Sequence, residues 1–168
     1  MIQLANQDSN IEPRSSGAYS VVRLMPNDPS HRKLFPQIVN RAVGFVDRIN
    51  ADSDPIWVGH LLYNHFQQRN NLVHVMAGID AESKIVLHAI SYVETRPKLG
   101  NVIILYQLEK DEAGGSDMLN VCFDLVKSWA VSLGIKTLLN ESSNRAKTRL
   151  WGRYGFSEYR VTSRLDLE

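Results

Sequence analysis

Residues 101–156 read NVIILYQLEKDEAGGSDMLNVCFDLVKSWAVSLGIKTLLNESSNRAKTRLWGRYGF, and this stretch decides the fold. It begins with a short apolar, β-branched run at residues 102–106, which is typical of a strand buried on both faces. Residues 113–116 contain two glycines and break that pattern. Apolar residues then recur at helical spacing over residues 117–133, and Gly134 follows where a helix end favours a left-handed residue. The order of strand, glycine loop and helix predicts a crossover unit of an α/β protein.

A second unit follows the first without a break. Residues 135–139 predict another strand, and Ser142 or Ser143 can cap a further helix that carries Ala146, Leu150 and Trp151. We expect Gly155-Phe156 to end that helix and to begin one more strand.

The rest of the chain predicts one domain preceded by a polar arm. Residues 1–17 are polar and predict a flexible arm, which can lie on its own domain or on a partner, and residues 18–168 predict the domain. A strand is expected at 18–25, a helix start at 27–30, and helix starts at Pro36 and at Asp54-Pro55. Strands at 72–79 and 84–95 form a hairpin around a turn at 80–83. The fold class is therefore mixed α/β, with a mostly antiparallel, twisted sheet of six to seven strands and about four helices.

Composition limits the kinds of partner. The 168 residues are 43% hydrophobic and 22% charged with a net charge of +1, which gives no argument for nucleic acid or acidic membranes. The one cysteine, Cys122, excludes a disulfide within the chain and predicts a buried small hydrophobe. No apolar run approaches the roughly 20 residues of a membrane span, and no signal peptide opens the chain. We expect a cytoplasmic protein, either in a cell or in a cell taken over by a virus.

The end of the 101–156 stretch carries a family resemblance. Asn144, then Leu150-Trp151, then Gly155-Phe156, followed by a polar-apolar strand, resembles the closing segment of the GNAT acyltransferase family. The similarity covers roughly residues 72–167, over half of the chain. It implies a GNAT-like domain in which an acyl-CoA, here acetyl-CoA, lies across two splayed strands beside the glycine loop. It also implies that a small-molecule or protein amine is the acyl acceptor.

The resemblance also assigns the cofactor residues. The pyrophosphate would rest on loop amides at the start of a helix, where N–H groups and the helix dipole favour an anion. The pantetheine would make strand-like bonds to β-strand residues before the loop, and an asparagine would contact the cofactor near the second crossover. In this sequence these residues are Gly114, Gly115 and Ser116 for the pyrophosphate, Tyr106 or Leu108 for the pantetheine, and Asn144.

The glycine loop departs from the family pattern in its charge. Asp111 stands where the family loop has Arg or Gln, and Glu109, Glu112 and Asp117 surround it with Lys110 as the opposing charge. Like charges near a pyrophosphate each cost a good part of ~1 kcal/mol even in a wet site. This cluster argues against tight CoA binding. The alternative interpretation is that the glycines only form a turn.

The catalytic positions are altered as well. Trp151 occupies the place of the family's acid tyrosine, and an indole N–H does not give up a proton near neutral pH. Tyr154, on nearly the same helix face, is the candidate acid, with core packing as its alternative role. Glu109 is the candidate base and Glu94 is the other candidate.

Other kinds of site have little support. The five histidines lack metal-ligand spacing, although His74 and His88 could face each other across the hairpin. No nucleophile elbow is present. Four basic residues of the last helix could meet a phosphate, and a solvated face is the alternative: Arg145, Lys147, Arg149 and Arg153.

Two functions from different classes remain open. The first is an acyl-CoA-dependent N-acyltransferase. The second is a catalytically inactive scaffold of the same fold, an interaction subunit of a larger assembly such as a phage particle, which uses residues 1–17 to contact protein partners.

Overall fold

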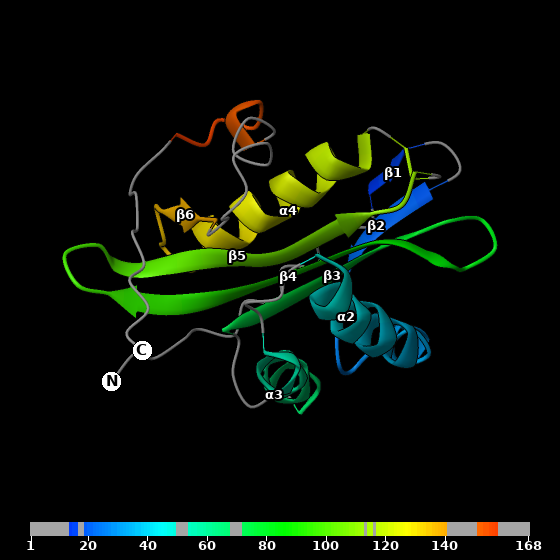
Figure 1. Cartoon of the computed structure of the whole chain (residues 1–168). Coiled ribbons are helices and arrows are strands. Elements are labelled where there is room, and N and C mark those ends of the chain that lie inside the picture. Colours follow the sequence, from blue (N-terminus) through cyan, green and yellow to red (C-terminus); the bar gives the residue numbers. More distant parts are fainter. Residues whose placement is uncertain are drawn as a thin grey trace.

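The computed structural model describes residues 14–16, 19–49, 54–67, 72–112, 114–115, 117–140 and 151–157. Six strands form one sheet in the order β1-β2-β3-β4-β5-β6. The first five strands are antiparallel to their neighbours, and β6 runs parallel to β5. Helices α2 and α3 cover one face of the sheet and α4 covers the other (Figure 1). The predicted mixed α/β class with a mostly antiparallel sheet is confirmed.

The strands follow the expected order, with some shifts at their ends. The hairpin of β3 (Val73–Ile79) and β4 (Ile85–Arg96) forms as predicted, and β5 (Gly100–Lys110) follows it. The strand expected at 18–25 is β2 (Tyr19–Arg23), whereas the strand expected at 135–139 contracts to β6 (Leu138–Leu139). Residues assigned to the polar arm contribute β1 (Arg14–Ser16), which pairs with β2. An edge strand pairs through its main chain, so a polar sequence can supply it.

The helices begin where their capping residues predict. Asp28 and Asp54 accept hydrogen bonds from the N–H groups of Ser30 and Ile56, each at 2.8 Å, and so cap α1 (Pro29–Arg32) and α3 (Pro55–Phe66). The longer helices of the described residues are α2 (Phe35–Ile49) and α4 (Asp117–Ser132). Gly134 follows α4 with a φ of 67°, as its position predicts.

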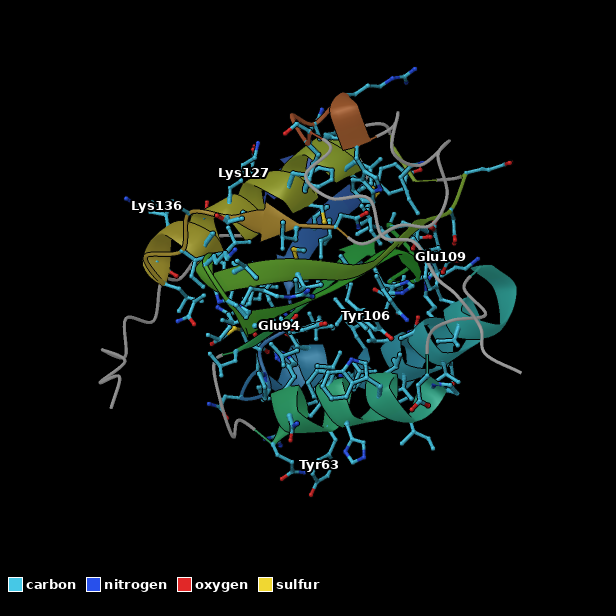
Figure 2. All side chains as sticks on the ribbon, turned by 60° about the vertical axis from the view of Figure 1, so that its left-hand side comes forward. Tyr63, Glu94, Tyr106, Glu109, Lys127 and Lys136 are labelled. Atoms are coloured by element: carbon cyan, nitrogen blue, oxygen red, sulfur yellow. The ribbon has the colours of Figure 1, made fainter. Side chains whose placement is uncertain are left out.

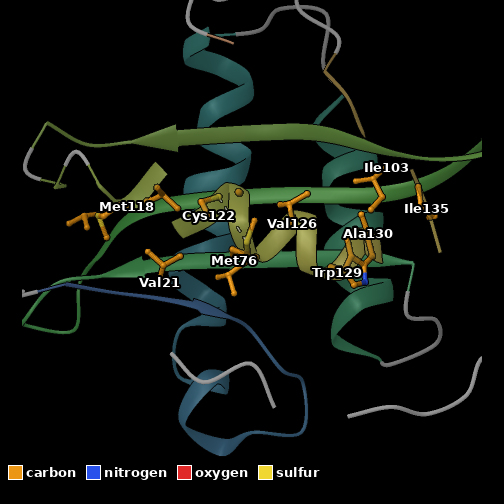
Figure 3. Close-up of a cluster of buried hydrophobic side chains, with 13 residues drawn as sticks. Val21, Met76, Ile103, Met118, Cys122, Val126, Trp129, Ala130 and Ile135 are labelled. Carbon is orange, nitrogen blue, oxygen red and sulfur yellow. Dashed lines mark hydrogen bonds between the residues drawn. The ribbon is translucent and has the colours of Figure 1, made fainter. Parts of the chain in front are cut away.

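Buried apolar side chains pack on each face of the sheet. Between α4 and the sheet, buried side chains include Met76, Ile103, Met118 and Cys122 (Figure 3). On the opposite face, α2 and α3 pack through residues such as Ile38, Leu62 and Ile90. The sheet is therefore apolar on both faces through its centre, which explains the continuous apolar runs in β3, β4 and β5.

Gly78 allows the first turn of α4 to approach the sheet. A Cβ at this position would lie 2.5 Å from Met118 Cε and 2.8 Å from Leu87 Cβ. Met118 is fully buried, so the methyl group has no free direction in which to move. This close contact fixes the start of α4, and with it the glycine loop, against the sheet.

Candidate active site

Among the described residues, the pairing of β5 with β6 is short. Their parallel pairing covers only Ile103 with Leu138 and Ile104 with Leu139. At the next residue the Asn140 side chain takes over, because its Nδ2 donates to the Leu105 carbonyl oxygen at 3.0 Å. β5 then continues to Lys110 with β4 on its other edge. Among the described residues, the β6-side edge of residues 106–110 therefore has no strand beside it.

A β-bulge lies at the point where the two strands part. Ile90 pairs with Gln107 and Ser91 pairs with Leu105, so Tyr106 is the extra residue on β5. The bulge turns two successive side chains to the α2–α3 face. Tyr106 packs into the core on that face, and Gln107 Nε2 donates to the Ala42 carbonyl oxygen at 3.2 Å. Leu108 returns to the α4 face.

The glycine loop folds around a lysine. Lys110 Nζ donates to the carbonyl oxygens of Asp111, at 2.9 Å, and Gly114, at 2.6 Å. The Gly114 N–H donates to Asp111 O at 3.0 Å, so this amide is used within the loop. A Cβ at Gly114 would lie 3.0 Å from Lys110 Cγ and 3.1 Å from Met118 Sδ, whereas a Cβ at Gly115 would meet only the Tyr19 ring, at 3.7 Å and beyond. The loop is thus packed at Gly114 and open at Gly115, directly before the first turn of α4.

An arginine from α2 is paired with the acidic cluster at the loop. Arg41 of α2 donates from Nη1 to Asp111 Oδ2 at 3.0 Å and from Nη2 to Asp111 Oδ1 at 2.9 Å. The same Nη2 donates to Glu109 Oε2 at 3.2 Å. The hydrogen bond from Arg41 is the main reason that the pKa of Asp111 lies below its ordinary value. The expectation that Lys110 alone opposes this cluster was therefore wrong.

A buried polar network continues from Glu109 under the bulge. His88 Nδ1 lies 3.5 Å from Glu109 Oε2, and His88 Nε2 lies 3.2 Å from Gln107 Oε1. Gln107 donates its own amide hydrogen to Ala42, so its Oε1 accepts the Nε2–H of His88. The network ties α2 to the bulge and to the strand that enters the loop.

The histidines of the hairpin do not face each other, contrary to one expectation. The register places His74 opposite Ser91 and His88 opposite Ala77. His74 stacks on Trp129 of α4, with ring centroids 4.8 Å apart, whereas His88 meets Phe45 of α2 edge-on. The two rings therefore lie on opposite faces of the sheet, because the register offsets them by three residues.

The other candidate residues lie in different surroundings. Glu109 accepts a hydrogen bond from Arg41, and the ring of Tyr154 lies against that of Phe123 of α4, tilted by 31° with ring centroids 4.3 Å apart. Trp151 is buried in the same aromatic cluster, and its Nε1 has no hydrogen-bond partner among the described residues. Ser116 and Asn144 lie outside the described residues, as does the strand expected after Phe156.

A groove opens on the α3 side of the sheet, close to the bulge. It has a volume of about 350 Å³ and is lined by the α3 residues Trp57, Leu61 and Asn64 and by the strand residues Leu72, Val73, Tyr92, Val93 and Glu94. Trp57 meets Tyr92 edge-on at 6.1 Å, and Tyr92 meets Tyr106 edge-on at 5.9 Å. A line of three rings thus leads from the groove to the bulge. Figure 2 shows Glu94 and Tyr106 on this side of the sheet.

Two residues of the site were missed from the sequence. Arg41 lies seventy positions before Asp111, in a helix whose other face is apolar, and no local pattern marks it. Asn140 could have been found, because a polar residue directly after a short apolar strand can bond to the neighbouring strand's main chain.

Two further observations concern the described part of the chain. None of its helices is long and apolar enough to cross a membrane. Its His, Cys, Asp and Glu side chains form no group of three or more that could hold a metal ion.

Comparison with solved structures identifies the fold. An aminoglycoside acetyltransferase from an uncultured soil metagenomic sample aligns with a TM-score of 0.61 at 18% identity, covering 90% of this chain and 97% of that chain. A second aminoglycoside acetyltransferase from such a sample aligns at 0.59 and 13% identity, covering 89% and 99%. A protein described as a probable acetyltransferase aligns at 0.63 and 12% identity, covering 88% and 96%. No protein-family model and no curated protein matches the sequence.

These similarities define the fold class. The chain has the GNAT-type fold, and the alignments extend over nearly the whole length of both chains. At these identities the likeness concerns the fold, and the activity has to be argued from the site itself.

Proposed function

We propose that this protein is an acyl-CoA-dependent N-acyltransferase, which transfers an acetyl group from acetyl-CoA to an amine. The observation that carries the proposal is the parting of β5 from β6 at Leu105, directly before a glycine loop that opens a helix. The parted edge supplies main-chain groups for an extended ligand, and the helix start supplies a site for an anion. The structural neighbours named acetyltransferases support the same reading.

The site residues fit a bound acyl-CoA in two places. The edge of β5 from Tyr106 to Lys110 would bond the pantetheine amides, and the loop at Gly115 and Ser116 would hold the pyrophosphate. Arg41 neutralises Asp111, and Lys110 adds a positive charge to the loop, which weakens the electrostatic objection to an anion there. The Gly114 N–H donates to Asp111 O within the loop, so we do not assign it to the pyrophosphate. Asn144 remains a proposed cofactor contact.

Acetyl-CoA would supply the thioester. The reaction joins the acceptor nitrogen to the acetyl carbon, breaks the carbon–sulfur bond and releases a proton from the nitrogen. Glu94 is the better placed acceptor for this proton, through water, because it lines an open groove and Glu109 does not. Both carboxylates are paired with an arginine, Glu94 with Arg96 and Glu109 with Arg41. Tyr154 remains the proposed acid for the departing thiolate, since an indole at Trp151 cannot serve. The single, buried Cys122 suits the reducing cytoplasm, which we propose as its compartment.

Two measurements test this function. Acetyl-CoA at 100 times its dissociation constant stabilises a folded protein by about 2.7 kcal/mol, which corresponds to a rise in Tm of about 5–10 °C for a chain of this size. Release of the CoA thiol, followed while amines are offered, reports turnover. Glu94→Gln should lower kcat more than Glu109→Gln does. No shift in Tm at millimolar acetyl-CoA removes the proposal.

A scaffold function is the second candidate. Two observations favour a scaffold. The Gly114 N–H already donates within the loop, and a buried tryptophan, Trp151, stands where the family has its acid tyrosine. Such a scaffold would use the arm of residues 1–17 to contact a protein partner, for example in a viral particle. Deletion of residues 1–13 leaves β1 in place and should disrupt that assembly while the Tm stays unchanged. An intact assembly after the deletion excludes this candidate.

A further inference from the structure

We infer that the groove beside α3 binds the acyl acceptor, and that this acceptor is a cationic amine attached to an apolar, aromatic body. The inference rests on the proposed function, because it names the substrate class of the same site. It is argued from the walls of the groove, from its charge and from its connection to the bulge.

The walls of the groove are aromatic and partly exposed. The indole of Trp57 is 44% exposed, although its neighbours on α3, Val58, Leu61 and Leu62, are buried. Exposed tryptophan beside tyrosine offers large flat surfaces at little cost in side-chain entropy. A volume of about 350 Å³ matches the smaller ligand sites of proteins, which hold compact organic molecules.

The charge of the groove favours a cation. Glu94 follows Tyr92 by two residues on the same face of β4, so its carboxylate stands beside the rings. One of its oxygens, Oε2, forms an ion pair with Arg96 at 3.0 Å, which keeps the carboxylate in place and offsets part of its charge, while the other oxygen, Oε1, has no part in this pair. Arg96 itself does not line the groove. An ammonium group would meet both the carboxylate and the negative faces of the rings, whereas an anion would be repelled by both.

The aromatic wall of the groove continues, through ring contacts, toward the place where acyl transfer would occur. Tyr92 contacts Trp57 on one side and Tyr106 on the other, and Tyr106 is the bulged residue beside the parted edge of β5. An amine seated along these rings therefore approaches the edge proposed to hold the thioester. A long, fully hydrated polycation would use this wall poorly, since it has little apolar surface to bury.

The test uses three small probes of matched shape: phenethylamine, 2-phenylethanol and 3-phenylpropionate. Their affinities are measured by calorimetry or by saturation-transfer NMR on the full chain without acetyl-CoA. The amine should bind at least tenfold more tightly than the alcohol and the acid. Equal binding of the three probes, or no binding of the amine at millimolar concentration, overturns the inference.

Variants locate the site and separate it from the proposed function. Glu94→Gln and Trp57→Ala should each weaken phenethylamine binding by about tenfold, as the loss of a charge pair or a cation–π contact predicts. Glu82→Gln, in the exposed hairpin turn, is the matched control and should leave binding unchanged. Unchanged binding in both groove variants, with their Tm preserved, overturns the inference. If acetyl-CoA fails to shift the Tm while phenethylamine binding depends on Glu94, the transferase proposal fails and the cation site stands.

Discussion

Arg41 and Asp111 form a two-pronged ion pair across 70 positions of sequence, with each guanidinium Nη donating to one carboxylate oxygen at 3.0 and 2.9 Å. Arg41 also donates to the Ile85 carbonyl oxygen and to Glu109, so α2, β4 and the end of β5 meet at one side chain. Planar arginine suits this arrangement because its donors form a fixed fork. The pair holds the strand end from which the glycine loop departs.

Removal of Arg41 should therefore destabilise the protein. Arg41→Ala leaves two carboxylates facing each other, and we expect a loss of about 1–3 kcal/mol in the free energy of unfolding, less than for a fully buried pair because Asp111 is 35% exposed. Chemical denaturation measures the loss. Arg41→Lys should recover only part of it, since an ammonium cannot form the fork. A double-mutant cycle with Asp111→Ala that shows no coupling would contradict this account.

Acid should destabilise the protein in two separate pH windows. Burial lowers the pKa of His65 to about 4 and holds the pKa of His74 well below 6.5, so the unfolded chain binds more protons than the folded chain below pH 6.5. Stability is therefore full above pH 6.5 and falls toward pH 4, by about 1.4 kcal/mol per pH unit for each histidine. The depressed pKa of Asp111 acts lower: its contribution is present above 3.8 and is lost as pH falls through its folded pKa. Urea denaturation at a series of pH values measures both windows.

His74→Phe separates one histidine from the other. Both ring nitrogens of His74 are buried without a hydrogen-bond partner among the described residues, while the ring stacks on Trp129. Phenylalanine keeps the stack and removes the two polar atoms, so stability at pH 7 should be unchanged or higher by up to about 1 kcal/mol. The slope between pH 6.5 and 4 should become shallower. A loss of more than about 1 kcal/mol at pH 7 would count against this assignment.

Gly78 and Gly59 should respond to alanine in opposite ways. Gly78→Ala forces a methyl group against Met118 and Leu87 and should cost about 1–3 kcal/mol. Gly59 lies within α3 with nothing within 4 Å of its added Cβ, so Gly59→Ala should stabilise by about 0.5–1 kcal/mol. The two variants are compared by thermal unfolding. Equal effects would show that the approach of α4 to the sheet is looser than described.

Cys122 should not react in the folded protein. It is fully buried beside Met76, and burial raises the pKa of its thiol to about 12. A thiol reagent should label it only after denaturation, so assays that follow the CoA thiol would have no background from the enzyme. Rapid labelling at pH 8 under native conditions would contradict its position between α4 and the sheet.

The sequence predicts the sheet, the hairpin and α4 because their apolar periodicities are strong and local. Capping residues such as Asp54 predict helix starts for the same reason. The electrostatics of the loop could not be predicted, since Arg41 reaches Asp111 through tertiary packing. The separation of His74 from His88 depends on strand register, which the pattern of the hairpin alone does not set. The shortness of β6 depends on Asn140, whose side chain bonds to β5 where a further strand residue would have paired.

Acetyl-CoA binding along the parted edge of β5 is the central claim, and an NMR titration of the backbone amides tests it most directly. The account predicts that acetyl-CoA shifts the amides of residues 105–110 and of Gly115, with little change in β3 (Val73–Ile79), which β4 separates from β5. Saturable shifts confined to those residues would agree with the claim. No shift at millimolar acetyl-CoA, or shifts confined to another face of the sheet, would contradict it.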